Sequence, residues 1–143
     1  PAPPVHIPMD AYADIDIVTP NQAEAEFITG VRVTDSRSAQ QAAEIFRDWG
    51  VRVAIVKIGE DGVYYSADED EGFVSAFHVD AVDTTSAGDA FGGGFAVALA
   101  EGRSLGDAVR FGAAAGALAV TRPGVQDSIP SRSEVDSLLV VSQ

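Results

Sequence analysis

The stretch from Asp83 to Phe95, which reads DTTSAGDAFGGGF, has the composition of an anion-binding site with a carboxylate inside it. A turn of small residues leads into an apolar run of helical length, so a helix is expected to begin near Gly88. The first N–H groups of a helix lack partners and carry partial positive charge, and glycine lets an anion approach them closely. Ser86, Ala87 and Gly88 are therefore candidates for an anion hole.

Asp89 stands within this predicted anion site. A carboxylate there repels an anion. It is useful, however, if it takes the proton from a hydroxyl that attacks phosphorus, while the helix amides stabilise charge on the transferred phosphoryl group. Alternatively, Asp89 is a first-turn residue that only satisfies the helix dipole. The residues alone leave both interpretations open, and the first predicts phosphoryl transfer.

The rest of the sequence predicts an α/β domain that holds this stretch. The expected strands are 14–19, 51–58, 62–67 and 72–79, and the expected helices are 22–29, 35–49, 88–101, 105–120 and 131–140. The first two strands and the helices between them form a βαβ unit, so their sheet is at least partly parallel. The next two strands form a hairpin on the sheet edge, and the later helices are expected to pack on the sheet. Residues 1–12 are expected to be extended or loop.

The predicted helix ends follow from capping residues. The expected N-caps are Asn21, either Ser36 or Ser38, Ser104, and Ser131, the last with Glu134 in a capping box. Asn21 by itself is read as a cap rather than as a ligand. The glycines at 92–94 are costly inside a helix, which indicates that another backbone or a ligand packs closely there, and the alanine-rich helix around 113–119 is the natural candidate.

Three loops are expected at one edge of the sheet. Ligands of open α/β sheets sit beyond the carboxyl ends of the strands. The loops there should include Pro20–Asn21, Gly59–Gly62 and Thr84–Asp89, each with glycine or asparagine. Their gathering at one edge is the structural argument for a site.

The composition excludes several classes of protein. The 143 residues are 46% hydrophobic, which suits one domain with a core. With 22 acidic and 9 basic residues the net charge is −13, and no basic cluster suggests nucleic-acid binding. No apolar run approaches the ~20 residues of a membrane span. The absence of cysteine excludes disulfides and thiolate metal sites and fits a reducing, cytoplasmic location.

Four motifs, spread over nearly the whole chain, resemble motifs that occur in the same order in the C-terminal half of the ribokinase (PfkB) family of carbohydrate kinases. DTTSAGDAFGGGFA, from Asp83, is similar to the C-terminal signature of that family. TPNQAEAE, at 19–26, resembles its N-x-x-E segment, and KIGEDG, at 57–62, resembles its strand-end nucleotide loop. TRPGVQDSIP, at 121–130, is similar to the loop after the helix beside the adenine. The resemblance implies a partial three-layer α/β/α fold of ribokinase type.

The resemblance also implies an ATP-dependent sugar kinase and a role for each matched residue. Asp89 would be the base and would contact the sugar, and Ser86, Ala87 and Gly88 would form the anion hole with the N–H of Asp89. ATP would be bound by Asn21, Lys57, Ile58, Gly59, Glu60, Asp61, Gly62, Gly88, Asp89 and Ala113. Glu24 would help hold Mg²⁺ through water. K⁺ would be bound by groups of Asp83, Thr85, Ala119, Arg122, Gly124 and Ser128, several of them backbone carbonyls.

The resemblance covers one half of such a kinase. The N-terminal half of the family supplies most of the sheet, the sugar-binding glycines and the lid that often forms a homodimer, and the opening Pro1-Ala2-Pro3-Pro4 favours the interior of a longer protein. This segment alone is expected to be inactive, so that ribose phosphorylation by it would contradict the expectation. The loop at 121–130 favours D-ribose, converted to ribose 5-phosphate. Fructose, a keto-deoxy sugar acid or a nucleoside are alternatives, as is a non-catalytic nucleotide-binding module.

Overall fold

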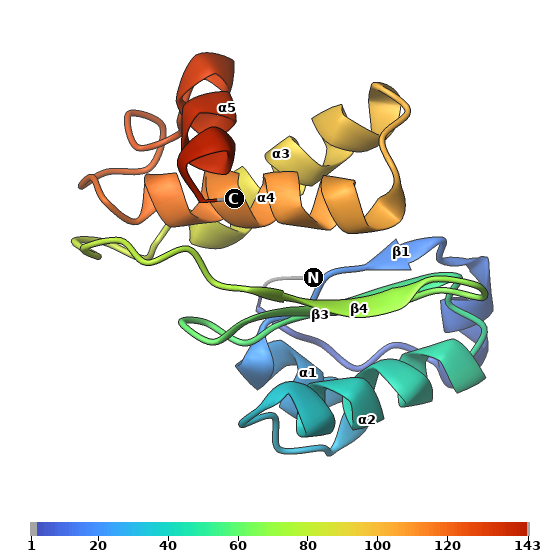
Figure 1. Cartoon of the computed structure of the whole chain (residues 1–143). Coiled ribbons are helices and arrows are strands. Elements are labelled where there is room, and N and C mark those ends of the chain that lie inside the picture. The colour runs from blue at the N-terminus through green and yellow to red at the C-terminus, as the bar shows by residue number, and fades with distance from the viewer. Residues whose placement is uncertain (1–2, 143) are drawn as a thin grey trace. The chain divides into compact units, whose positions relative to one another are not determined.

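The computed structural model describes residues 3–142, whose elements belong to two units, Pro1–Ser75 and Ala76–Gln143. The first unit holds a mixed sheet with two α-helices, and the second holds three α-helices (Figure 1). In chain order the elements are η1 (Met9–Asp14), β1 (Ile17–Val18), α1 (Gln22–Thr29), α2 (Ser36–Asp48), β2 (Val53–Lys57), β3 (Gly62–Ser66), β4 (Glu71–Ser75), α3 (Ala87–Ala100), α4 (Leu105–Ala119) and α5 (Arg132–Val141). Pro1 and Ala2, predicted to be extended or loop, lie outside the described residues.

The sheet of the first unit has the strand order β1-β2-β3-β4. β1 and β2 are parallel, with Ile17 opposite Val53, and α1 and α2 lie between them in the chain. β3 pairs antiparallel with both β2 and β4, and β3 and β4 are joined by the acidic turn at 67–70. The predicted βαβ unit and the predicted edge hairpin are therefore both confirmed.

Helices α1 and α2 lie on one face of this sheet, and apolar residues fill the space between the layers (Figure 1). From α2, Ala39, Ala42, Ala43 and Phe46 are buried, at the i, i+3, i+4, i+7 spacing of a helix face. They pack with residues of β2 and with Tyr12 in one hydrophobic cluster. This core fixes α1 and β2, whose ends carry the predicted nucleotide-binding residues.

The N-terminal part of the first unit differs from the prediction. Residues 9–14 form a 3₁₀ helix instead of a loop, and the strand predicted at 14–19 is only Ile17–Val18. The 3₁₀ turn buries the ring of Tyr12, whose centroid lies 5.0 Å from that of Trp49 and 5.9 Å from that of Phe46. Aromatic burial of this kind outweighs local propensity, and it depends on partners more than 30 residues away.

Two predicted boundaries in the first unit also shift. Helix α2 is capped by Asp35, whose Oδ1 accepts from the N–H of Ser38 at 2.8 Å, and neither Ser36 nor Ser38 is the N-cap. Ser38 completes a capping box at the third helical position. Strand β4 ends at Ser75 rather than at Val79.

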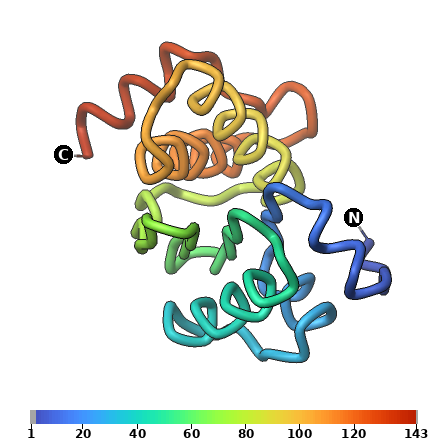
Figure 2. The backbone as a smooth tube through the Cα atoms, turned by 90° about the vertical axis from the view of Figure 1, so that its right-hand side faces the viewer, coloured from blue at the N-terminus to red at the C-terminus, as the bar shows by residue number. Residues whose placement is uncertain are grey.

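Helices α3 and α4 of the second unit approach each other closely at their glycines, and they lie side by side in Figures 1 and 2. A Cβ on Gly94 would lie 2.9 Å from the Cβ of Ala115, and one on Gly112 would lie 2.9 Å from the carbonyl oxygen of Phe91. The close packing predicted for the glycines is thus confirmed for Gly94. It is not found for Gly92 and Gly93, where a Cβ would meet nothing within 4 Å.

The ends of α4 and α5 agree with the predictions. Ser104 caps α4 by accepting from the N–H of Asp107 at 3.2 Å. Ser131 and Glu134 form the predicted capping box of α5. Arg132 in α5 pairs with Glu101 after α3 and, at 2.8 Å, with Asp136. The caps therefore fix the ends of α4 and α5, and the Arg132–Glu101 ion pair links α5 to the end of α3.

Candidate active site

The first turn of α3 leaves backbone donors unused. Ser86 is the N-cap, its carbonyl accepts from the N–H of Ala90 at 2.9 Å, and the N–H of Ala87 donates to Thr84 at 3.2 Å. Within residues 3–142, no hydrogen bond uses the N–H of Gly88 or Asp89, and both residues are exposed. The predicted helix start is confirmed. Its two unpartnered donors stand where an anion hole requires them.

The next helix provides an internal comparison, because Ser104-Leu105-Gly106-Asp107 repeats the S-x-G-D order of Ser86-Ala87-Gly88-Asp89. In α4 the serine hydroxyl donates to Asp107 Oδ2 at 2.7 Å and accepts from its N–H, which is ordinary capping. In α3 the serine makes no cap bond, and the Asp89 side chain has no hydrogen bond or ion pair within the described residues. Of these two similar sequences, only the one at the start of α3 therefore leaves the N–H and the carboxylate of its aspartate available to a ligand.

Ser86 is diverted from capping by the loop at 121–130. Its hydroxyl donates to the carbonyl oxygens of Gly124 at 3.3 Å and Val125 at 3.1 Å. The hydroxyl of Ser128 donates to the same Val125 carbonyl at 2.8 Å, and both serines are buried, with 2% and 1% of their surface exposed. Buried hydroxyls require partners, so these bonds fix the loop against the start of α3. The positive φ of Gly124, 101°, lets the chain turn there.

Asp83 also contacts the loop at 121–130. Its Oδ1 accepts from the hydroxyl of Thr85 at 2.6 Å and from the N–H of Thr85 at 2.9 Å, and its Oδ2 accepts from the N–H of Gly124 at 3.3 Å. These hydrogen bonds, led by that of the Thr85 hydroxyl, hold the pKa of the Asp83 carboxyl below its usual range. Asp83 is therefore ionised at neutral pH and lies beside loop carbonyls.

The predicted K⁺ residues are brought together in part. Asp83, Thr85, Gly124 and Ser128 are connected by the contacts above, and Ala119 is the last residue of α4, buried. Arg122 turns its side chain to Glu134, so only its backbone is left for a cation. No group of three or more His, Cys, Asp or Glu residues that could hold a metal occurs in the described part of the chain. One carboxylate among hydroxyl and carbonyl oxygens is a donor set suited to K⁺.

The predicted nucleotide residues of the first unit lie together at the end of β2. Asn21 forms an isolated parallel bridge with Lys57, and the N–H of Lys57 donates to Pro20 at 2.9 Å. Asn21 and Glu24 form a reciprocal capping box, with both hydrogen bonds at 2.9 Å. The prediction that Asn21 caps α1 is thus confirmed. A ligand role for either side chain requires it to leave the cap or to use its remaining lone pairs.

The loop after β2 is a tight turn. The N–H of Ile58 donates to Gly62 at 2.8 Å, and Gly59 and Gly62 have φ values of 58° and 138°. Ile58 is buried, whereas Gly59, Glu60 and Asp61 are exposed. The exposed residues can meet a ligand, and Ile58 can do so only through its backbone. Ala113, the predicted adenine neighbour, lies in the middle of α4 and is half-buried.

Two features of the second unit were not predicted from the sequence. Val125 contributes the carbonyl that accepts from both Ser86 and Ser128, and a backbone group of this kind leaves no signal in a sequence. Glu134 was predicted only as a capping residue, but it also pairs with Arg122, and this pairing, with the Ser131 contacts, lowers the pKa of Glu134 to about 2. The sequence does show Arg122 twelve residues before Glu134, but this spacing alone does not indicate that the two side chains pair.

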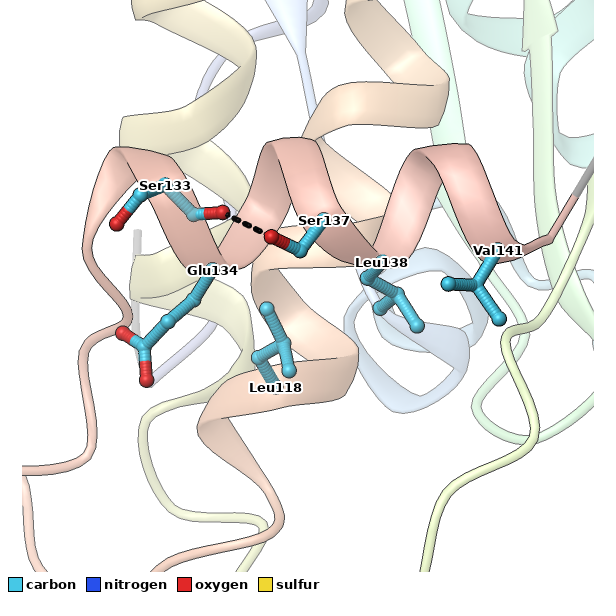
Figure 3. A pocket seen from close by; sticks show the side chains of 6 residues that line it. All are labelled: Leu118, Ser133, Glu134, Ser137, Leu138 and Val141. Carbon is cyan, nitrogen blue, oxygen red and sulfur yellow. Dashed lines mark hydrogen bonds between the residues drawn. The ribbon is translucent and has the colours of Figure 1, made fainter.

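A groove of about 430 Å³ lies between α4 and α5 (Figure 3). It is lined by Leu118, Ser133, Glu134, Ser137, Leu138 and Val141. None of these is a predicted site residue. The candidate site is therefore defined by the donors and carboxylates at the start of α3 and not by a deep cavity.

Among the described residues, no helix has the length and apolarity to cross a membrane.

The chain is similar to known carbohydrate kinases. Residues 3–132 match the family described as pfkB family carbohydrate kinase. The ribokinase of Haemophilus influenzae is 46% identical over 134 residues, which are 94% of this chain and 44% of that protein. The structure of Arabidopsis thaliana ribokinase complexed with ribose and ATP aligns with a TM-score of 0.85 and 36% identity, over 93% of this chain and 43% of that one. That of Escherichia coli phosphofructokinase-2 in complex with potassium aligns with a TM-score of 0.80 and 28% identity, over 93% and 44%.

These similarities confirm the predicted ribokinase-like α/β fold and its partial extent. The chain spans less than half the length of each relative named above. The match nevertheless covers almost the whole of this chain and includes every residue of the candidate site. The chain belongs to the pfkB family of carbohydrate kinases.

Proposed function

We propose that the natural protein carrying this chain is an ATP-dependent sugar kinase that phosphorylates a primary hydroxyl, with D-ribose as its acceptor and ribose 5-phosphate as its product. The observation that carries this proposal is the start of α3, where the N–H groups of Gly88 and Asp89 and the carboxylate of Asp89 have no partner among residues 3–142. Donors for a developing anion and a base for a hydroxyl are what phosphoryl transfer needs at one place.

In this proposal Asp89 is the base. Its carboxylate accepts the proton of the sugar hydroxyl as that oxygen attacks the γ-phosphorus, and the bond from the γ-phosphorus to the bridging oxygen of ADP breaks. The N–H groups of Gly88 and Asp89, with Ser86 and Ala87 shaping the turn, stabilise the negative charge of the transferred group. The helix dipole adds to this stabilisation because the group sits at its positive end.

ATP is assigned to the loops that the resemblance indicates. Asn21 would lie by the phosphates, and the turn from Lys57 to Gly62, together with the region of Ala113, would flank the nucleoside. The exposure of Gly59, Glu60 and Asp61 supports such contacts. Glu24 would hold Mg²⁺ through water, and this ion would supply charge neutralisation at the phosphates. The homodimer through a lid and the cytoplasmic location stay predictions.

Ribose is favoured over other acceptors because the loop at 121–130 resembles that of ribokinases and because a relative was solved with ribose and ATP. The test is an ADP-release assay of the purified natural protein with D-ribose, D-fructose, 2-dehydro-3-deoxygluconate and adenosine at matched concentrations. We expect the largest kcat/KM with D-ribose. A preference for another acceptor would reassign the substrate. If none of the four acceptors gave an ATP-dependent product, the protein would instead be a non-catalytic nucleotide-binding module.

Potassium activation is a second expectation of this proposal. A cation held by Asp83 and the loop oxygens would add positive potential behind the α3 N-terminus and order the groups that form it. We therefore expect the natural protein to turn over severalfold faster in potassium chloride than in sodium chloride of the same ionic strength. The Asp83→Asn variant should lose most of this difference. Equal rates of the wild type in both salts would contradict the assignment.

A further inference from the structure

The loop at 121–130 joins α4 to α5 and carries the groups that meet the start of α3. The N–H of Gly124 donates to Asp83, and the carbonyls of Gly124 and Val125 accept from Ser86. The loop contains no helix or strand of its own. Contacts that hold the two ends of such a loop therefore contribute, with these hydrogen bonds, to the position of Gly124 and Val125.

A single carboxylate holds both ends. Oε2 of Glu134, in the first turn of α5, accepts from the N–H of Ser131 at 2.7 Å and from its hydroxyl at 2.8 Å, just after the loop ends. Oε1 of the same group accepts from Nη2 of Arg122, the second residue of the loop. Figure 3 shows this carboxylate extending from α5 away from Leu138 and Val141.

This contact is suited to position the loop rather than to stabilise the unit. Both side chains of the Arg122–Glu134 pair are 39% exposed, and ion pairs at that exposure contribute little to folding. The capping box, however, already fixes the glutamate on the helix, so Arg122 meets a carboxylate that is held in place. The pair thus ties the start of the loop to the helix that follows its end.

We propose that Glu134 is a positioning residue for the candidate site: by holding Arg122 and Ser131 together, it keeps Gly124 and Val125 of the loop against Asp83 and Ser86. Its effect on catalysis rests on the proposed function, whereas its effect on the loop does not. The oxygens of the loop and of Asp83 are those assigned to K⁺, so a loosened loop should weaken the response to that ion before it affects nucleotide binding.

The first test is hydrogen–deuterium exchange of the natural protein. In Glu134→Ala, amide exchange of the segment 121–128 should be faster by about fivefold, a factor typical of losing one such contact. Glu101→Ala is the matched control, because Glu101 also pairs with an arginine of α5, Arg132, but touches no part of the loop. Exchange of the loop in that variant should be unchanged. Arg122→Ala should loosen the loop as Glu134→Ala does, and the double variant should add nothing further.

The second test measures the potassium concentration for half-maximal activation. It should rise about fivefold in Glu134→Ala and stay unchanged in Glu101→Ala. If Glu134→Ala does not fold, Glu134→Gln carries both tests, because it keeps an acceptor for Ser131 and loses only the charge that binds Arg122. Faster exchange confined to α5, or equal loop exchange in both glutamate variants, would overturn the proposal. A wild type without kinase activity would refute the proposed function, and the exchange results would still decide the role of Glu134.

Discussion

Replacing Asp89 with asparagine is expected to lower the turnover number of the natural protein by about 10³-fold while leaving ATP binding close to that of the wild type. Asparagine keeps the size of the side chain and the N–H groups of the first turn of α3, but it cannot accept the proton of the attacking hydroxyl. The carboxylate has no protein partner within the described residues, so its loss should not disturb the fold. The measurements are steady-state kinetics and calorimetric titration with ATP.

Asp107→Asn is the matched control for this variant. Asp107 occupies the same position of an S-x-G-D turn, at the third residue of α4, but its carboxylate accepts from Ser104 at 2.7 Å and serves the cap. The control should therefore keep its turnover and lose some stability. If Asp89 only satisfied the helix dipole, the two variants would behave alike, with similar small losses of stability and unchanged kcat. That outcome would remove Asp89 as the base.

The parts of the fold that could be predicted from the sequence are those with local signals. Asn21 and Gly30 mark the ends of α1 because a capping side chain and a left-handed glycine act on their own helix. The same holds for Ser104 and for Ser131 with Glu134. The turn at Gly59–Gly62 could likewise be predicted, because glycine is the residue that adopts positive φ values most easily.

The parts that could not be predicted depend on contacts between distant residues. Tyr12 forms a 3₁₀ turn because its ring packs on Phe46 and Trp49, which a reading of its neighbours cannot show. In the site, Ser86 had the sequence of a helix cap like Ser104, yet it donates to carbonyls almost 40 residues away. The sequence therefore predicted a set of candidate site residues, but not that the Ser86 hydroxyl bonds to the loop at 121–130 instead of capping α3, which leaves the N–H of Asp89 available.

The stability of the second unit should respond in opposite directions to two alanine substitutions at helical glycines. Gly112→Ala is expected to lower the free energy of unfolding by about 2 kcal/mol, because the added Cβ would lie 2.9 Å from the carbonyl oxygen of Phe91 and 3.1 Å from the Cβ of Phe95. The backbone oxygen cannot move aside, so α3 and α4 must separate. Gly93→Ala should instead raise it by about 1 kcal/mol, since the Cβ meets nothing and alanine favours the helix.

Urea unfolding of the natural protein measures both changes, and kinetics show whether they reach the site. Separation of α3 from α4 should also move the start of α3, because a Cβ on Gly116 would lie only 3.1 Å from the carbonyl oxygen of Ala87 and the helices are in contact along that whole length. Gly112→Ala should therefore lower kcat as well as stability, whereas Gly93→Ala should leave kcat unchanged. If both variants gained stability, the close approach of the two helices would be wrong. If Gly112→Ala lost stability alone, the anion hole would not depend on their spacing.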